Sequence, residues 1–317
     1  MASQSREPSM PYVSLNDGNR MPQLGLGLSI PPEKSVRVVL DGLETGYRLL
    51  DTAAAYRTEF GVCEAVARSG LAREDIFITT KLASHGRETA LRSFERSLQR
   101  LGSDYVDLYL IHYPYPDLDR YVETWKALTE LKGDGRARSI GVSNFRADQL
   151  ERIADATGVV PAVNQIELHS SLQQTELRHL HSQRGIVTEA YSPLRGGSAL
   201  QDTMIRDLAE RQNRTPAQIV LRWHIQLGNV VIPRSLRRDR LEENMRIFDF
   251  DLGEDDLVSM AALDNEDRLG PDPATLRAPT GARRAIRELA ERSASVDRLV
   301  QSAGDIVAVV RKLTGRL

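Results

Sequence analysis

Short apolar runs alternate with longer amphipathic segments along most of the chain. Eight runs of four to eight residues are rich in Leu, Ile and Val, and they lie near Leu24, Leu50, Ile78, Leu108, Ile140, Val163, Val187 and Val231. Runs that are apolar at nearly every position are typical of strands buried on both faces, as in a parallel sheet. The pattern therefore predicts eight parallel strands.

The segments between these runs place apolar residues at i, i+3, i+4 and i+7, the spacing of a helix with one buried face. Residues 35–46, 88–102 and 121–135 show this spacing, and each ends on the glycine that is common just past a helix. Eight strand–helix units of about 25 to 30 residues match a (β/α)8 TIM barrel of about 250 residues. An open doubly wound sheet is the competing fold, but its usual G-x-G-x-x-G turn follows neither residues 24–27 nor residues 48–51.

Two segments fall outside the eight units. Residues 12–25 hold a D-G turn between short extended runs, which predicts a β-hairpin that closes the bottom of the barrel. Beyond residue 275, apolar or small residues recur in steps of three and four, at Ile286, Leu289, Ser293, Val296, Val300, Ala303, Val307 and Val310. We predict a barrel over residues 1–275 and an amphipathic helical C-terminal extension over residues 276–317.

The extension is basic as well as amphipathic. Arg and Lys outnumber Asp and Glu by nine to four between Leu276 and Leu317. Three interpretations stay open: a helix docked on its own barrel, a self-association helix, or a basic helix on an anionic surface. The expected oligomeric state is a monomer or self-association through this helix.

The composition narrows the functional classes. The 317 residues carry a formal net charge of -2 and a pI of about 6.3, so a polyanionic partner such as nucleic acid is not expected. Cys63 is the only cysteine, which excludes an internal disulfide and suits a reducing cytoplasm. The chain starts without an apolar leader, and no apolar run approaches the ~20 residues needed to cross a bilayer. We therefore expect a cytoplasmic protein without membrane association.

Ionisable residues stand at the ends of three consecutive apolar runs. Asp51, Lys81 and His112 close the second, third and fourth runs, and Tyr56 follows a few residues after the first of these. In a barrel, catalytic groups lie at the carboxyl ends of the strands, because the loops there are free to vary. A charge at the end of a buried strand needs a partner, since isolation in a low dielectric is costly. We expect Asp51 and Lys81 to satisfy each other.

This grouping predicts an acid that protonates a developing alkoxide. A phenol titrates near 10, and the adjacent Lys81 ammonium is expected to lower the pKa of Tyr56 by about 1 to 3 pH units. Asp51 would hold the ammonium in place, and His112 would donate a hydrogen bond to the same carbonyl oxygen. Each residue alone also has a structural interpretation, as a helix cap, a solvent charge, a core histidine or a packing aromatic. Their joint placement favours catalysis.

The same residues lie in motifs that resemble the aldo-keto reductase family, from about Tyr12 to about Pro273. The motifs around the four residues are GYRLLDTAAAYRTEFGVCEAV, FITTKL and YLIHYP. GVSNF, VNQIELH, EAYSPL and PAQIVLRWHIQLGNVVIPRS follow in order, which is most similar to bacterial members of the 2,5-diketo-D-gluconate reductase type. The resemblance implies that the catalytic tetrad consists of Tyr56, Asp51, Lys81 and His112.

The resemblance also implies that NADPH is the cofactor. Ser143, Asn144 and Gln165 match residues that hold the nicotinamide carboxamide, and Tyr191 matches the residue that stacks on the ring. Further candidate cofactor contacts at strand ends and in the loop over the pyrophosphate are Gly27, Leu28, Ser192 and Leu194. On sequence alone, ordinary turn chemistry explains Ser143 and Asn144 equally well.

The segment PRSLRRDRLEEN has four arginines within seven residues, directly after the last predicted strand and at the start of a predicted helix. Cations beside the free amides of a helix N-terminus favour a phosphate monoester, and barrels commonly bind phosphate after their last two strands. A solvated basic patch is the alternative. By resemblance, the ribose phosphate of NADPH would be held by Arg234, Ser235 and Arg240, and the adenine by Glu243 and Asn244.

Three positions depart from the family pattern. Ser29 stands where a large aromatic residue is usual, and Tyr113 replaces the tryptophan that usually follows the catalytic histidine. With His112, these residues are expected to line a substrate pocket that is wider or wetter than usual. Arg195 replaces the glycine of SPLG, and it would either contact the pyrophosphate or stiffen a loop whose motion releases the cofactor.

The predicted activity is the reduction of an aldehyde or ketone to an alcohol, with NADPH as hydride donor, Tyr56 as proton donor and no metal. The expected partner is a small-molecule carbonyl substrate. A lyase or aldolase with Lys81 as a Schiff base is a second hypothesis, opposed by the pairing with Asp51, because a permanently charged amine is not nucleophilic. A cofactor-binding regulatory or partner-binding barrel that uses the C-terminal helix is the third.

Overall fold

The computed structural model describes residues 10–83 and 85–280, and its centre is a closed ring of parallel strands. Leu24 forms a parallel bridge with Val231, and Gly25 N donates to Val231 O at 2.8 Å, so the last strand meets the first. The eight strands follow chain order around the sheet: β3 (Leu26–Gly27), β4 (Leu49–Asp51), β5 (Phe77–Leu82), β6 (Val106–Ile111), β7 (Ala137–Ser143), β8 (Val163–Glu167), β9 (Val187–Tyr191) and β10 (Val230–Val231). The predicted (β/α)8 TIM barrel is confirmed.

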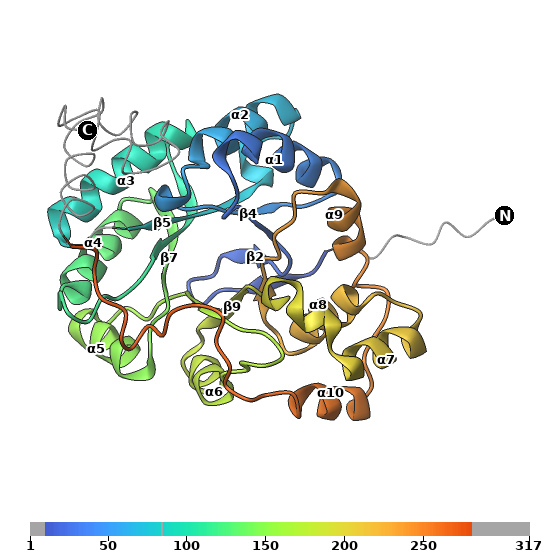
Figure 1. The fold of residues 1–317 in the computed structure, drawn as a ribbon. Helices are drawn as coiled ribbons and strands as arrows, with labels where there is room; N and C mark the ends of the chain where they lie inside the picture. Colours follow the sequence, from blue (N-terminus) through green and yellow to red (C-terminus); the bar gives the residue numbers. More distant parts are fainter. Residues whose placement is uncertain (1–9, 84, 281–317) are drawn as a thin grey trace, which may run out of the picture.

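Helices surround the ring on its outside (Figure 1). They are α1 (Ser35–Glu44), α2 (Glu59–Ser69), α3 (Arg87–Leu101), α4 (Tyr121–Gly133), α5 (Ala147–Thr157), α6 (Thr175–Arg184), α7 (Thr203–Gln212), α8 (Pro216–Gln226), α9 (Arg238–Met245) and α10 (Glu254–Ala261). Short 3-10 helices lie at η1 (Pro32–Lys34), η2 (Ala54–Tyr56), η3 (Arg73–Asp75) and η4 (Arg195–Gln201). The apolar stripes of α1, α3 and α4 face the strands, as their sequence spacing predicts.

The predicted N-terminal hairpin is present as β1 (Tyr12–Ser14) and β2 (Arg20–Pro22). Its turn needs Gly18, whose φ of +88° lies in the left-handed region. Leu15 and Met21 pack in one cluster with Leu49, Leu108 and other residues from inside the barrel. The hairpin therefore closes one end of the ring, and a ligand site is left to the opposite end, where the strands finish.

The segment after α10 crosses the carboxyl ends of the strands toward α4 (Figure 1). Asn265 N donates to Ser171 O, Leu269 N to the Glu167 carboxylate and Ala278 N to the Asp117 carboxylate. Residues 281–317, which hold nearly all of the predicted helical extension, lie outside the described residues. The domain boundary at residue 275 and the role of the extension stay predictions. Within the described ranges, no helix is long and apolar enough to span a bilayer.

Candidate active site

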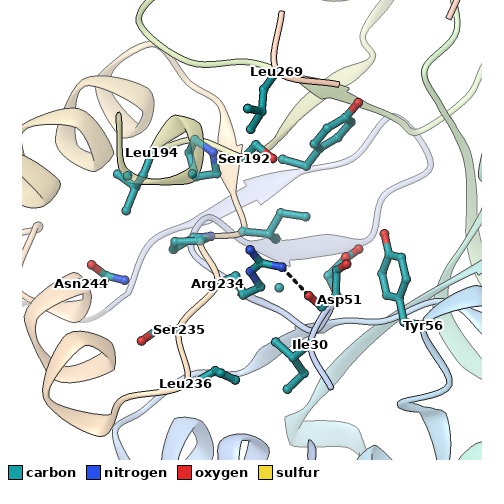
Figure 2. A pocket seen from close by; sticks show the side chains of 18 of the residues that line it. Ile30, Asp51, Tyr56, Ser192, Leu194, Arg234, Ser235, Leu236, Asn244 and Leu269 are labelled. Atoms are coloured by element: carbon teal, nitrogen blue, oxygen red, sulfur yellow. Dashed lines mark hydrogen bonds between the residues drawn. The ribbon is translucent and has the colours of Figure 1, made fainter. Parts of the chain in front are cut away.

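A cavity of about 910 Å³ opens at the carboxyl ends of the strands. Figure 2 shows Asp51 and Tyr56 at one end of it and Ser235 and Asn244 at the other, with Arg234 between them. Its walls include most of the residues that the sequence singled out: Gly27, Ser29, Asp51, Tyr56, His112, Tyr113, Ser143, Asn144, Gln165, Tyr191, Ser192, Leu194, Arg234, Ser235, Arg240 and Asn244. The fold thus brings the candidate catalytic and cofactor residues together around one space.

Asp51 and Lys81 form a buried ion pair on neighbouring strands. Lys81 Nζ lies 2.6 and 2.7 Å from the two Asp51 carboxylate oxygens and donates to Thr52 O at 3.0 Å. Burial lowers the pKa of Lys81, but the Asp51 carboxylate, together with Tyr56 and Glu189, outweighs this effect, so that the pKa lies above its ordinary value. Lys81 is therefore a protonated amine that Asp51 holds in place. This favours an electrostatic role for Lys81 over the formation of a Schiff base.

Tyr56 is placed by the turn that follows β4. It ends η2, and Arg57 leaves that helix in the left-handed region, at φ +61°. The Tyr56 hydroxyl lies 3.4 Å from His112 Nε2, and Lys81 Nζ lies 5.0 Å from the centre of the Tyr56 ring. His112 is held at the end of β6, where its backbone N–H donates to the backbone carbonyl of Leu82 at 3.0 Å. The phenol and the imidazole therefore lie on the cavity wall, and the buried ammonium lies beside the phenol ring.

The predicted pKa shift of Tyr56 is wrong in sign. Enclosure by the protein raises the pKa of Tyr56, and the Lys81 charge together with its hydrogen bond only partly offsets this. Asp51 adds to the rise through its negative charge. The sequence shows that Lys81 is near, but it does not show how strongly the phenol is screened from water. Tyr56 is consequently a neutral phenol that retains its proton at neutral pH.

Gln165 links the ion pair to a residue that the sequence analysis missed. Gln165 Nε2 donates to Asp51 Oδ2 and to Glu189 Oε2, both at 2.8 Å. Burial, followed by the Asp51 charge, raises the pKa of Glu189 to about 8. A signal for Glu189 was available, since it is a charged residue inside the apolar run GIVTEAYS. It lies in the middle of β9, whereas the catalytic groups of a barrel are expected at strand ends.

Ser143, Asn144 and Tyr191 form a connected amide and hydroxyl cluster beside the tetrad. Asn144 Nδ2 donates to His112 O at 3.0 Å and to Ser143 Oγ at 2.9 Å, while Tyr191 OH donates to Asn144 Oδ1 at 2.9 Å. Asn144 holds this place in the left-handed region, at φ +65°, which asparagine tolerates well. The cluster is more than ordinary turn chemistry, because it ties the ends of β6, β7 and β9 together.

The arginines after β10 have different partners. Arg237 pairs with Asp239, and Arg238 pairs with Glu44 and Glu242, so these two take part in surface ion pairs. Arg234 lies on the cavity wall (Figure 2) and donates to the Ser29 carbonyl at 2.7 Å. Arg240 lies on the cavity wall, and no ion pair in the described part of the chain involves it. Arg240 is thus placed to meet an anion.

Two predicted cofactor residues do not line the cavity. Leu28 is fully buried, and its carbonyl accepts from Thr58 Oγ1 at 3.2 Å. The Glu243 carboxylate accepts from Thr215 Oγ1 at 2.6 Å. Gly27 does line the cavity, and a Cβ there would lie 2.7 Å from Ile232 O, so the close approach of these strands requires glycine. The cofactor roles of Leu28 and Glu243 stay predictions.

The loop after β9 is tied to the segment after α10. Arg195 forms an ion pair with Asp267, which favours the loop-stiffening alternative over a pyrophosphate contact. Nearby, the buried Glu167 carboxylate accepts from Leu269 N at 2.5 Å and Gly270 N at 2.9 Å. Leu269 in turn lines the cavity (Figure 2). Nothing in the local sequence identified these long-range contacts.

The pocket next to the tetrad is walled by aromatic rings and a serine. The Tyr113 ring lies 5.2 Å from that of His112 and stacks at 5.8 Å on Tyr115. Ser29 also lines the cavity and contributes no ring. Among residues 10–83 and 85–280, no group of three or more His, Cys, Asp or Glu side chains is arranged to hold a metal ion.

A closed barrel whose ionisable side chains gather at the carboxyl ends of its strands has the arrangement of a barrel enzyme. The chain belongs to the aldo/keto reductase family, whose family model matches residues 21–265. An aldo-keto reductase of Mycolicibacterium smegmatis is 52% identical over 268 residues, which cover 84% of this chain and 98% of that protein. The family expected from the motifs is confirmed.

Two further relatives bear on the site. Methylglyoxal reductase DkgA of Escherichia coli is 47% identical over 264 residues, which cover 82% of this chain and 96% of that protein. A Gox0644 mutant crystallised in complex with NADPH is 46% identical, with a TM-score of 0.82, and the match covers 85% of this chain and 99% of that one.

Proposed function

We propose that this protein reduces aldehydes or ketones to alcohols, with NADPH as hydride donor and the Tyr56 hydroxyl as proton donor. The observation that carries the proposal is the grouping of Tyr56 and His112 on the cavity wall with the buried Lys81 ammonium beside the phenol. The Tyr56 hydroxyl lies 3.4 Å from His112 Nε2 and beside Lys81, whose ammonium is held by Asp51. NADPH would supply the hydride when bound.

Each member of the tetrad has a distinct task in the proposed reaction. Tyr56 is neutral, because its pKa is raised, and it can give its proton to an oxygen that gains negative charge. The Lys81 ammonium stabilises the phenolate left behind, and Asp51 fixes the ammonium. His112 Nε2, when it carries the proton, donates to the same substrate oxygen and orients it.

The cavity suits a phosphorylated dinucleotide. Amides and hydroxyls from Ser143, Asn144 and Gln165 lie beside the tetrad, where they would hold the nicotinamide carboxamide. Arg240 and Ser235 lie at the far end with cationic and hydroxyl groups suited to a ribose phosphate. The relative Gox0644 is solved with NADPH, which supports the same cofactor here.

The test is loss of NADPH absorbance with a panel of carbonyls, repeated on Tyr56→Phe. Methylglyoxal belongs in the panel because of the Escherichia coli relative. Bulky or polar sugar aldehydes belong there because we expect Ser29, in place of a large aromatic residue, to widen the pocket. We expect Tyr56→Phe to lower kcat by about 10²-fold or more while NADPH binding, followed by fluorescence, is unchanged.

Other outcomes identify the competing functions. NADPH binding without turnover of any carbonyl would favour a regulatory barrel. Full activity in Tyr56→Phe would assign the proton to another donor. Borohydride trapping of a substrate on Lys81 would favour the Schiff-base lyase.

A further inference from the structure

Glu189 is a buried carboxyl that the proposed reaction does not use. It lies in β9 directly beside Gln165 of β8, and the strand register pairs the two residues. The residue is fully buried. Its Oε2 accepts from Gln165 Nε2 at 2.8 Å, whereas Oε1 has no hydrogen-bond partner in the part of the chain that the structure describes.

Stability does not explain a carboxyl at this position. A buried carboxyl with an unpaired oxygen is unfavourable, and the nearby Asp51 carboxylate makes its ionised form still less favourable. An apolar side chain in β9 would avoid both costs. The contact with Gln165 is therefore the feature that sets Glu189 apart from an ordinary core residue.

The two hydrogen bonds that the Gln165 side chain donates decide which of its side-chain atoms can bind a ligand. An amide nitrogen has two hydrogens, and Gln165 Nε2 directs them to Asp51 Oδ2 and Glu189 Oε2. One bond would leave the amide free to rotate about it, but two bonds fix its plane. The reversed amide would place an oxygen against the Asp51 carboxylate, which cannot donate. Gln165 lines the cavity, so the atom that it can offer there is its carbonyl oxygen.

We propose that Glu189 is a positioning residue which, together with Asp51, fixes Gln165 so that its carbonyl oxygen accepts a hydrogen bond from the nicotinamide carboxamide. This inference rests on the proposed function, because it needs a nicotinamide cofactor in the cavity. It adds a residue that acts through Gln165 and distinguishes the N–H2 group of the carboxamide from any substitute that cannot donate.

The charge of Glu189 gives the proposal a second consequence. The charged groups that face Glu189 are Asp51 from β4 and Lys81 from β5, while Gln165 from β8 is neutral. Because burial and the Asp51 charge raise the pKa of Glu189 to about 8, this carboxyl gains its negative charge only above that pH. This charge favours the positively charged oxidised ring over the neutral reduced ring. The ratio of Kd for NADP+ to Kd for NADPH should therefore fall about threefold to tenfold from about pH 7 to about pH 9.

Two variants and one cofactor analogue separate positioning from a structural role. Glu189→Leu removes both acceptor and charge, whereas Glu189→Gln keeps an acceptor oxygen for Gln165 but cannot ionise. Binding is measured directly by fluorescence titration with NADPH and with its 3-acetylpyridine analogue, in which a methyl group replaces the carboxamide N–H2. We expect Glu189→Leu to weaken NADPH binding about threefold to tenfold and to leave analogue binding within about twofold.

The conservative variant provides the rescue. Glu189→Gln should bind NADPH as the wild type does at neutral pH, and its Kd ratio for the two cofactor forms should no longer depend on pH. The melting temperature of the free Glu189→Leu variant should equal or exceed that of the wild type, because an unpaired buried carboxyl has been removed.

Contrary results are equally clear. Unchanged NADPH binding by Glu189→Leu, or an equal loss for NADPH and the analogue together with a lower melting temperature, would overturn the positioning role. Wild-type protein that bound no NADPH would refute the proposed function itself, and this inference with it. Wild-type binding with unaltered variants would refute only the role of Glu189.

Discussion

The two ends of the cavity are built from different parts of the fold. At the catalytic end, Asp51 and Lys81 come from barrel strands, and their side chains are 3% and 0% exposed. At the far end, Ser235 and Arg240 come from the loop after β10 and the exposed first turn of α9. The first set is fixed by packing within the barrel, whereas the second is half-buried or exposed at the surface.

This difference matches what each end has to do. A proton transfer depends on atoms held within a few tenths of an ångström, so buried partners on rigid strands suit it. An anion can be captured by exposed arginines through longer-range attraction, at the cost of sensitivity to salt. Substitutions at the two ends should therefore differ in kind: the buried end affects stability and chemistry together, and the exposed end affects affinity alone.

The largest effect is expected from Lys81→Met. It leaves the Asp51 carboxylate buried without its counter-charge, which should lower the free energy of unfolding by about 3–5 kcal/mol and abolish turnover. Urea denaturation and the NADPH assay measure the two effects. The double variant Lys81→Met/Asp51→Leu should recover most of the stability and none of the activity. An equally unstable double variant would contradict the view that the pair serves chemistry.

A smaller effect, confined to affinity, is expected from Arg240→Ala. Loss of this cation should raise Kd for NADPH about tenfold and leave Kd for NADH unchanged, because NADH lacks the ribose phosphate. Raising the ionic strength from about 0.05 to 0.5 M should weaken NADPH binding more in the wild type than in the variant.

Arg238→Ala is the matched control for Arg240→Ala. Arg238 lies in the same helix but pairs with Glu44 and Glu242 and does not line the cavity. Its Kd for NADPH should stay within about twofold of the wild type. Equal losses in the two variants would show that the general basicity of α9, and not a site at Arg240, attracts the cofactor.

The two ends also differ in how far the sequence predicts them. Asp51, Lys81 and His112 follow from apolar runs that finish in an ionisable residue, because strand ends converge in a barrel. The sign of the Tyr56 pKa shift does not follow, since the depth of a phenol in the wall is a property of the packed molecule. The partners of the arginines do not follow either. Arg195 and Asp267 are 72 residues apart, and no periodicity links them.

The smallest effect is expected at the contact between the loop after β9 and the segment after α10. Asp267→Asn removes the ion pair that ties Arg195, in the loop after β9, to the segment carrying Leu269. Because the pair is partly exposed, its loss should be worth at most about 1 kcal/mol. We expect NADP+ to dissociate about threefold faster in stopped-flow fluorescence, with the hydride-transfer step unchanged. Where product release limits turnover, kcat should rise by the same factor.

Asp249→Asn is the control for this contact, since it breaks a comparably exposed pair with Arg214 and neither residue lines the cavity. It should leave the dissociation rate of NADP+ unchanged. If Asp267→Asn also leaves that rate unchanged, then the loop is held by its own backbone, in which Gly196 and Gly197 take left-handed conformations at φ +63° and +96°. In that case Arg195 would have no part in cofactor release, and stiffening by this ion pair would be ruled out.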